Sequence, residues 1–137
     1  MADETAEEVI LTQERAALDR GSAGDPVGYV QDGAPDLTYF DDIGAQALVD
    51  GLDAVKDYLK TLEGQIPVHR YEVEDPKVQL YGDVGVLTLR YNPFSLEGEP
   101  QTPWRSTTVR RRNGESWQMV HAHWGSVVMS GLLKGGS

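Results

Sequence analysis

Hydrophobic residues follow two different periods along this chain, and the period changes near Pro67. Before that point, the clearest pattern covers residues 50–64, where apolar side chains recur at the spacing of one helical face. They are Leu52, Val55, Leu59 and Leu62. Gly64 is well placed to end this helix.

An earlier helix is predicted to begin near Thr5, which stands three residues before Glu8. This is the spacing of a capping box, in which both side chains bond the first free N–H groups of a helix. The pattern ends near Gly21 or Gly24.

Residues 24–33 favour a short second helix. Asp25 is predicted to cap it, and Pro26 suits its first turn. Residues 36–40 then form a short strand that leads into the sequence DDIGAQ.

After Pro67 the period becomes two, which is typical of strands. Five strands are predicted, at 68–73, 77–81, 84–92, 104–112 and 117–128. Gly82-Asp83 and Asn113-Gly114 are turn signals between them. Arg110 to Arg112 are interpreted as a solvated strand end before the second of these turns.

Helices followed by a long antiparallel meander predict an α+β fold. A strongly curved antiparallel sheet, wrapped around the N-terminal helices, would form a cone with an internal cavity. The length of 137 residues favours one domain, assigned to 1–128, with a flexible tail at 129–137.

Composition narrows the classes of function. The chain has no cysteine, which excludes disulfides, thiolate metal sites and a cysteine nucleophile. A formal charge of −10 argues against nucleic acid as a partner. No apolar run suits a signal peptide or a membrane span, so a cytoplasmic location with no membrane partner is expected. No nucleotide-binding or nucleophile-elbow motif occurs, and we expect no cofactor.

Three segments carry a resemblance to a known family. They are TYFDDIGAQALVDGLDAVKDYL at 38–59, DPKVQLYGD at 75–83 and RRRNGESWQMVHAHWGS at 110–126. Together they resemble the nuclear transport factor 2-like superfamily, and most closely the calcium/calmodulin-dependent protein kinase II association (hub) domain and its SnoaL-like relatives. The resemblance implies a cystatin-like cone. It does not choose among isomerases, cyclases, dehydratases, accessory binding proteins and oligomerisation modules.

The hub domain carries a cationic pocket, and the resemblance places its three arginine positions on Arg90, Thr107 and Trp124. Only the first is still an arginine. Arg105 lies two residues from Thr107 and would point the same way in a strand. Arg90 and Arg105 could therefore hold a carboxylate or an enolate.

Ketosteroid-isomerase-like relatives place a catalytic carboxylate soon after the first strand, where this chain has Asp41 and Asp42. They also use a tyrosine on the first helix, which has none in this sequence. Tyr29, Tyr39 or Tyr58 would have to replace it.

Alternation along the strands extends this assignment. If Arg90, Thr107 and Trp124 face the cavity, other side chains of the same strands must lie on the outer face. They include Leu89, Met119, His121 and His123. An outer face with this many apolar side chains needs a cover, which predicts a homodimer interface.

His121 and His123 also have a spacing that can chelate a metal, with His69 as the remaining histidine. Packing at the interface is the favoured interpretation, and no metal is expected.

Two functions stay open. The first is a SnoaL-like protein that binds a small apolar or conjugated ligand, as a cofactor-independent isomerase, cyclase or dehydratase, or as an accessory protein of a polyketide-type biosynthetic pathway. Asp41 or Asp42 would move the proton, and Arg90, a tyrosine or a histidine would stabilise the enolate-like charge. The second is a non-catalytic oligomerisation module like the hub.

Overall fold

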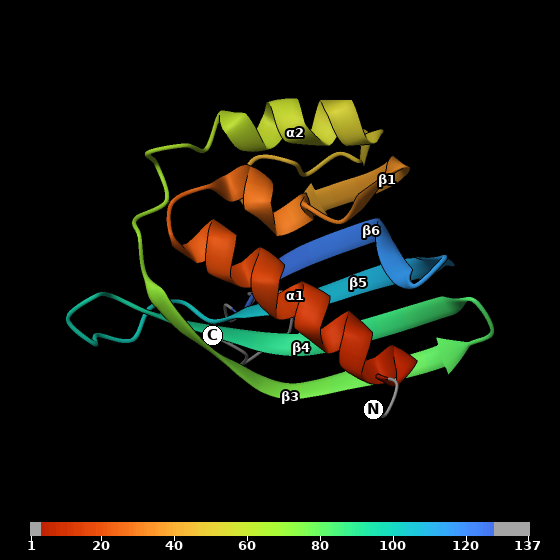
Figure 1. Ribbon diagram of the computed structural model, residues 1–137. Coiled ribbons are helices and arrows are strands. Elements are labelled where there is room, and N and C mark those ends of the chain that lie inside the picture. Colours follow the sequence, from red (N-terminus) through yellow and green to blue (C-terminus); the bar gives the residue numbers. More distant parts are fainter. Residues whose placement is uncertain (1–3, 128–137) are drawn as a thin grey trace, which may run out of the picture.

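The computed structural model describes residues 4–127 and contains two α-helices, one short 3₁₀ helix and six strands (Figure 1). The helices are α1 (Ala6–Ser22), η1 (Pro26–Val30) and α2 (Leu52–Lys60). The strands are β1 (Gly33–Asp41), β2 (Val49–Asp50), β3 (Arg70–Tyr81), β4 (Val84–Phe94), β5 (Trp104–Asn113) and β6 (Ser116–Ser126). The tail predicted at 129–137 lies outside the described residues.

All strands belong to one sheet in the order β2-β1-β6-β5-β4-β3. The predicted antiparallel meander is confirmed from β3 to β6, and β1 joins it by pairing parallel to β6. Figure 1 shows α1 crossing the sheet and α2 lying along the β1 side. The α+β class and the helix-covered curved sheet are therefore confirmed.

Of the two predicted helix caps, one is present in the structure. Thr5 caps α1, and its side-chain oxygen accepts a hydrogen bond of 3.1 Å from the backbone N–H of Glu8. Asp25 does not cap η1, so that prediction was wrong. Its carboxylate binds the guanidinium of Arg20 instead, because a charged donor forms the stronger hydrogen bond.

The two strands predicted at 68–73 and 77–81 form one strand, β3. Its register shifts between Glu74 and Lys77, and Asp75 has a positive φ of 51° at the same place. A bulge therefore continues the strand where the sequence pattern indicated a break.

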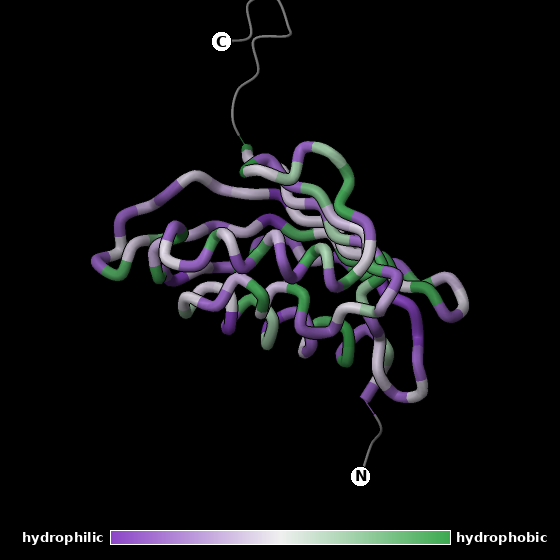
Figure 2. The backbone as a smooth tube through the Cα atoms, turned by 90° about the horizontal axis from the view of Figure 1, so that it is seen from above, coloured by the Kyte–Doolittle hydropathy of each residue, from purple (hydrophilic) through white to green (hydrophobic). Residues whose placement is uncertain are grey.

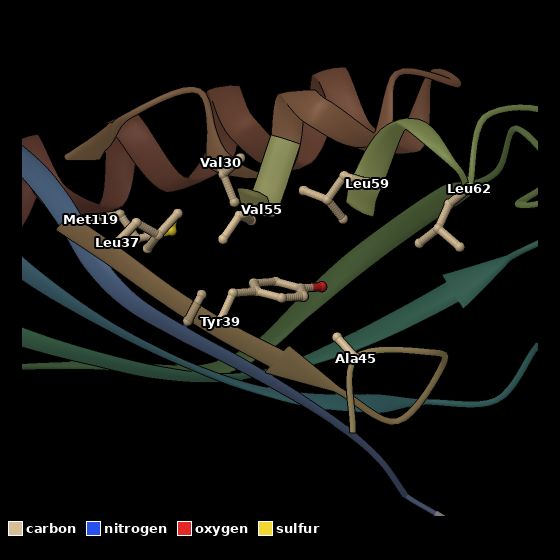
Figure 3. Close-up of a cluster of buried hydrophobic side chains, with 9 residues drawn as sticks. Val30, Leu37, Tyr39, Ala45, Val55, Leu59, Leu62 and Met119 are labelled. Carbon is tan, nitrogen blue, oxygen red and sulfur yellow. The ribbon is translucent and has the colours of Figure 1, made fainter. Parts of the chain in front are cut away.

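Two groups of apolar side chains fill the space between helices and sheet. Under α1 they are Ile10, Leu18, Leu87, Leu89, Tyr91 and Trp117. Under α2, the second group joins that helix to β1 and β6 (Figure 3). Of the helical stripe predicted at 50–64, Val55, Leu59 and Leu62 are buried in this group.

Hydrophilic and hydrophobic positions alternate along the helices, as the colours of the tube in Figure 2 show. This is the pattern of helices that cover a sheet on one side and meet water on the other. Within residues 4–127, neither helix has the length and apolar character needed to cross a bilayer.

Leu89 and Met119 were predicted on the outer face, and both predictions were wrong. Their exposed fractions are 6% and 1%, and both pack under the helices. For Met119 the reason is a register shift in β6: Met119 pairs with Arg110, whereas His121 pairs with Val109. The extra residue breaks simple alternation, so Met119 and His121 point to opposite faces.

Candidate functional site

A pocket of about 290 Å³ opens between the helices and the sheet. Its walls come from η1, α2, the strands β1, β4, β5 and β6, and the loops that follow β1 and precede β3 and β5. Most of the lining is aromatic or aliphatic, and the polar side chains are few. These polar residues are Asp41, Gln65, His69, Gln101 and Thr102, together with the hydroxyls of the tyrosines. The volume lies near the lower end of the range of about 300–1,000 Å³ for small-molecule sites.

Asp41 ends β1 on the wall of this pocket with 2% of its surface exposed. One carboxylate oxygen, Oδ1, accepts hydrogen bonds from the backbone N–H groups of Ile43, Gly44 and Ala45, at 2.8, 3.1 and 3.1 Å. The other, Oδ2, accepts from the Tyr39 hydroxyl at 2.8 Å. The side chain is therefore fixed in one orientation.

A second tyrosine completes this set of donors. The Tyr58 hydroxyl lies 3.0 Å from Oδ1 and 2.9 Å from Oδ2 of Asp41. It comes from α2, so the helix and the strand meet at this carboxylate. Five donors serve a group with about four lone-pair sites.

The local sequence explains why the chain turns at this point. The carboxylate of Asp41 bonds the N–H groups two to four residues ahead, as aspartate does in tight turns. The N–H of Asp41 bonds the carbonyl of Ala45 at 2.9 Å and closes the same loop. Asp42 points away from the pocket, is exposed, and accepts hydrogen bonds from the N–H and hydroxyl of Ser126. Of the two predicted carboxylates, Asp41 alone lines the pocket.

The tyrosines around Asp41 keep their protons over a wide pH range. Burial raises the pKa of Tyr58 to about 12, and the hydrogen bond to Asp41 adds to the effect. Burial, followed by the charge of Asp41, raises the pKa of Tyr39 well above its ordinary value. Both hydroxyls therefore act as donors to the carboxylate.

A second polar group on the pocket wall is His69, which residue patterns did not identify as a pocket residue. Its Nδ1 lies 2.8 Å from the carbonyl oxygen of Pro67, so Nδ1 is the nitrogen that carries a proton. Its Nε2 lies 2.5 Å from the hydroxyl of Tyr91. Burial, and then the neighbouring Tyr29, raises the pKa of Tyr91. The alternation of His69, Tyr71 and Val73 before and within β3 was the available signal.

Aromatic rings form much of the remaining wall. Trp124 meets Tyr29 and Tyr91 edge to face, with ring centroids 5.6 and 5.3 Å apart. Gly21 leaves room for Tyr29, because a Cβ at that position would lie 2.3 Å from the tyrosine ring. Tyr29, Tyr39 and Trp124, which were predicted to bind substrate, all line the pocket. Their role in binding stays a prediction.

Arg90, Arg105 and Thr107 do not face the pocket, and their predicted direction was wrong. Arg90 pairs with Arg105, and Thr107 pairs with His123, so these four side chains share the face away from the helices. The Arg90 side chain is 44% exposed and lies 4.0 Å from Glu74. Leu87, Leu89 and Tyr91 lie on the inner face of β4. Burying these side chains removes more apolar surface from water than burying Arg90 would.

His121 and His123 also lie on that outer face. The ring of Phe40 stacks on His123 with a centroid distance of 4.4 Å, and Nδ1 of His121 lies 2.9 Å from the hydroxyl of Thr38. Burial, and then the proximity of His123, lowers the pKa of His121. In the described part of the chain, no three side chains of metal-ligating type come together.

Solved structures resemble this fold over most of their length. A protein proposed to be a ketosteroid isomerase, from Parabacteroides distasonis ATCC 8503, has a TM-score of 0.76 at 28% identity and covers 90% of this chain and 89% of its own. The CaMKII hub of S. rosetta has a TM-score of 0.74 at 22% identity, with 92% and 100% covered. An NTF2-like protein of unknown function from Pseudomonas putida KT2440 has a TM-score of 0.76 at 23% identity, with 99% and 95% covered.

Two of these likenesses are below 25% identity and bear on the fold alone. No curated protein matches the chain. The family model described as the SnoaL-like domain matches residues 15–130, which is most of the chain. With its curved sheet, its covering helices and this match, the chain belongs to the SnoaL-like domain family within the nuclear transport factor 2-like fold.

Proposed function

We propose that this protein binds a small, flat and largely apolar ligand in the pocket and carries out a proton-transfer isomerisation or cyclisation on it, as part of a polyketide-type biosynthetic pathway. The observation that supports this most is the carboxylate of Asp41, the one carboxylate among the described lining residues, on the wall of a largely apolar pocket. A buried carboxylate beside a ligand is a suitable general base. The likeness to a protein proposed to be a ketosteroid isomerase agrees with this class of reaction.

Asp41 is the group that would move the proton. Because its lone pairs are all occupied, one donor has to leave before the carboxylate accepts a proton from a ligand. Tyr58 shares one proton between both oxygens and is the more exposed of the two tyrosines, so it is the donor that would move. Its hydroxyl could then hydrogen-bond the developing enolate, the role that the sequence assigned to Arg90.

The test separates binding from turnover. Isothermal titration calorimetry with 2-naphthol, a flat apolar probe with one hydroxyl, measures binding. Ile66→Trp, at a half-buried lining position, should fill the pocket and weaken binding at least about tenfold, or about 1.4 kcal/mol. Leu96→Trp, at an exposed position outside the pocket, is the matched control. Equal binding by both variants would contradict the pocket as the site.

Turnover is tested with cyclohex-3-en-1-one, whose isomerisation to the conjugated ketone is followed by ultraviolet absorbance. Asp41→Asn should lower the rate by about 10²- to 10⁴-fold. Asp42→Asn changes the neighbouring exposed carboxylate and should leave the rate unchanged. If the parent protein binds 2-naphthol but does not isomerise the ketone, the enzymatic part of the proposal is wrong and an accessory binding role remains.

Self-association is a second candidate function, favoured by the outer face of the sheet. Within residues 4–127 no helix covers this face, which carries the half-buried rings of Phe40, His121 and His123. Several hub domains share the fold. Light scattering distinguishes a dimer from a large ring, and Phe40→Glu should shift either toward the monomer. A monomeric parent protein would rule this candidate out.

A further inference from the structure

The sequence analysis predicted arginines in the pocket, whereas the charged side chain found there is the carboxylate of Asp41. Among the described residues that line it, Asp41 carries a formal negative charge, and there is no lysine or arginine. Arg90 and Arg105, the predicted cations, are on the opposite face of the sheet. The donors around Asp41 are neutral N–H and O–H groups, so they spread its charge without cancelling it.

Aromatic rings form part of the pocket walls. Five of the lining residues are tyrosine or tryptophan: Tyr29, Tyr39, Tyr91, Trp104 and Trp124. The face of such a ring carries partial negative charge and attracts a cation within about 6 Å of its centre. Trp124 holds Tyr29 and Tyr91 edge to face, so several rings surround the same space.

We propose that this pocket selects an organic cation: a substituted ammonium group attached to an apolar, ring-containing body. The inference rests on the proposed ligand-binding function of the same pocket, and not on turnover. The apolar body buries itself against Leu59, Leu62 and Ile66, as a neutral ligand would. The charged nitrogen is attracted both by Asp41 and by the aromatic faces.

The chemistry excludes the opposite ligand class. A carboxylate or phosphate placed in the pocket would be repelled by Asp41 and would find no lysine or arginine among the described lining residues. An alkylated ammonium also loses less hydration on burial than a compact anion does. The formal charge of −10 on the whole chain attracts cations toward the protein before they bind.

Three probes of nearly the same shape test the proposal by isothermal titration calorimetry. Benzyl(2-hydroxyethyl)dimethylammonium is the cation. In 3,3-dimethyl-4-phenylbutan-1-ol, carbon replaces the charged nitrogen, and 3,3-dimethyl-4-phenylbutanoate carries a negative charge instead. We expect the cation to bind at least about tenfold more tightly than the alcohol, and the acid to bind most weakly.

Variants assign the preference to particular side chains. Asp41→Asn should lower the ratio of cation to alcohol affinity at least about threefold, with the remainder due to the aromatic rings, while the alcohol still binds within about threefold of its original affinity. Asp42→Asn should leave the ratio unchanged. If Asp41→Asn does not fold, Trp104→Leu tests the same idea, because leucine keeps the apolar contact and removes the aromatic face.

Each outcome is decisive. Alcohol and cation of equal affinity in the parent protein would overturn the cation proposal and leave the ligand-binding function in place. An unchanged ratio in both Asp41→Asn and Trp104→Leu would overturn it as well. If none of the three probes binds, the proposed function of the pocket fails instead.

Discussion

Glu14 and Asp41 are carboxylates of almost equal burial, with 3% and 2% of their surfaces exposed, but their surroundings differ. Glu14, on α1, accepts a hydrogen bond of 2.7 Å from the guanidinium of Arg110, which is completely buried. Asp32 lies 3.6 Å from the same guanidinium. Asp41 has only neutral donors and borders a pocket.

The difference separates a carboxylate paired with a buried cation from one that is held by neutral donors beside a pocket. Arg110 bonds Glu14 and the carbonyl of Trp117 and thereby ties α1 to β5 and β6, and none of these three residues lines the pocket. Burial raises the pKa of Glu14, opposed by Arg110. At Asp41 the protein supplies orientation without an opposite charge. Its position on the pocket wall supports the proposed role of Asp41 in ligand binding.

The largest effect is expected from breaking the Glu14 pair. Arg110→Met removes the cation and leaves the buried carboxylate of Glu14 and the partly exposed carboxylate of Asp32 without it, which should cost about 3–5 kcal/mol of unfolding free energy in urea titrations. Arg111→Met is the matched control, because Arg111 pairs with Asp36 at the surface, where water screens the pair, so its loss should change stability much less. A similar loss of unfolding free energy in both variants would show that the buried pair contributes no more to stability than the surface pair.

A smaller loss is expected at Asp41. Asp41→Ala leaves three backbone N–H groups and two hydroxyls without their acceptor, and buried unsatisfied groups cost about 1–3 kcal/mol. Chemical denaturation measures this loss. Asp42→Ala removes only exposed hydrogen bonds to Ser126 and serves as the control. A greater loss at Asp41 than at Arg110 would reverse the comparison.

The stability of the protein should depend on pH through the buried carboxylate of Glu14. Because the folded pKa of Glu14 lies above its ordinary value of 4.5, the folded state holds a proton that the unfolded chain has already released. Stability therefore falls as pH rises from about 4.5 through the raised value, by at most about 1.4 kcal/mol per pH unit. Urea titrations across this range measure the slope, and Glu14→Gln should flatten it. An unchanged slope in that variant would show that another group titrates.

The smallest effect is expected at Arg90. Its side chain is half in solvent on the face away from the pocket, so Arg90→Ala should change unfolding free energy by about 0.5 kcal/mol or less. Binding of 2-naphthol should also remain unchanged, as calorimetry can check. A clear loss of binding would restore Arg90 to the site and weaken the assignment of the pocket to Asp41.

Local chemistry made several features predictable from the sequence. The capping residues Thr5 and Glu8 placed the start of α1, and the apolar stripe of 50–64 placed the buried side of α2. Gly82 and Gly114 marked two hairpins, where both have positive φ. Each of these depends on interactions within a few residues of the chain. Asp41 was a predicted site residue for another reason: the resemblance to ketosteroid-isomerase-like proteins implies a carboxylate just after the first strand, at Asp41 or Asp42.

The directions of side chains were not predictable in the same way. Both faces of β4 carry apolar residues, so alternation alone could not say whether Leu89 or Arg90 points inward, and α1 decided it by covering one face. A bulge in β6 separated Met119 from His121. Arg110 was interpreted as solvated, yet Glu14, 96 residues earlier in the chain, allows it to be buried.

The sequence by itself determined most of the elements and the turns, because these follow from short-range hydrogen bonding and periodicity, and its resemblance to known proteins implied a carboxylate at Asp41 or Asp42. Only the tertiary structure decided which face of each strand is covered and which charges lie together. Those outcomes depend on elements far apart in the chain, and on the cost of burying a charge without a partner. The same packing turned Arg90 and Arg105 outward and left Asp41 beside the aromatic rings of the pocket.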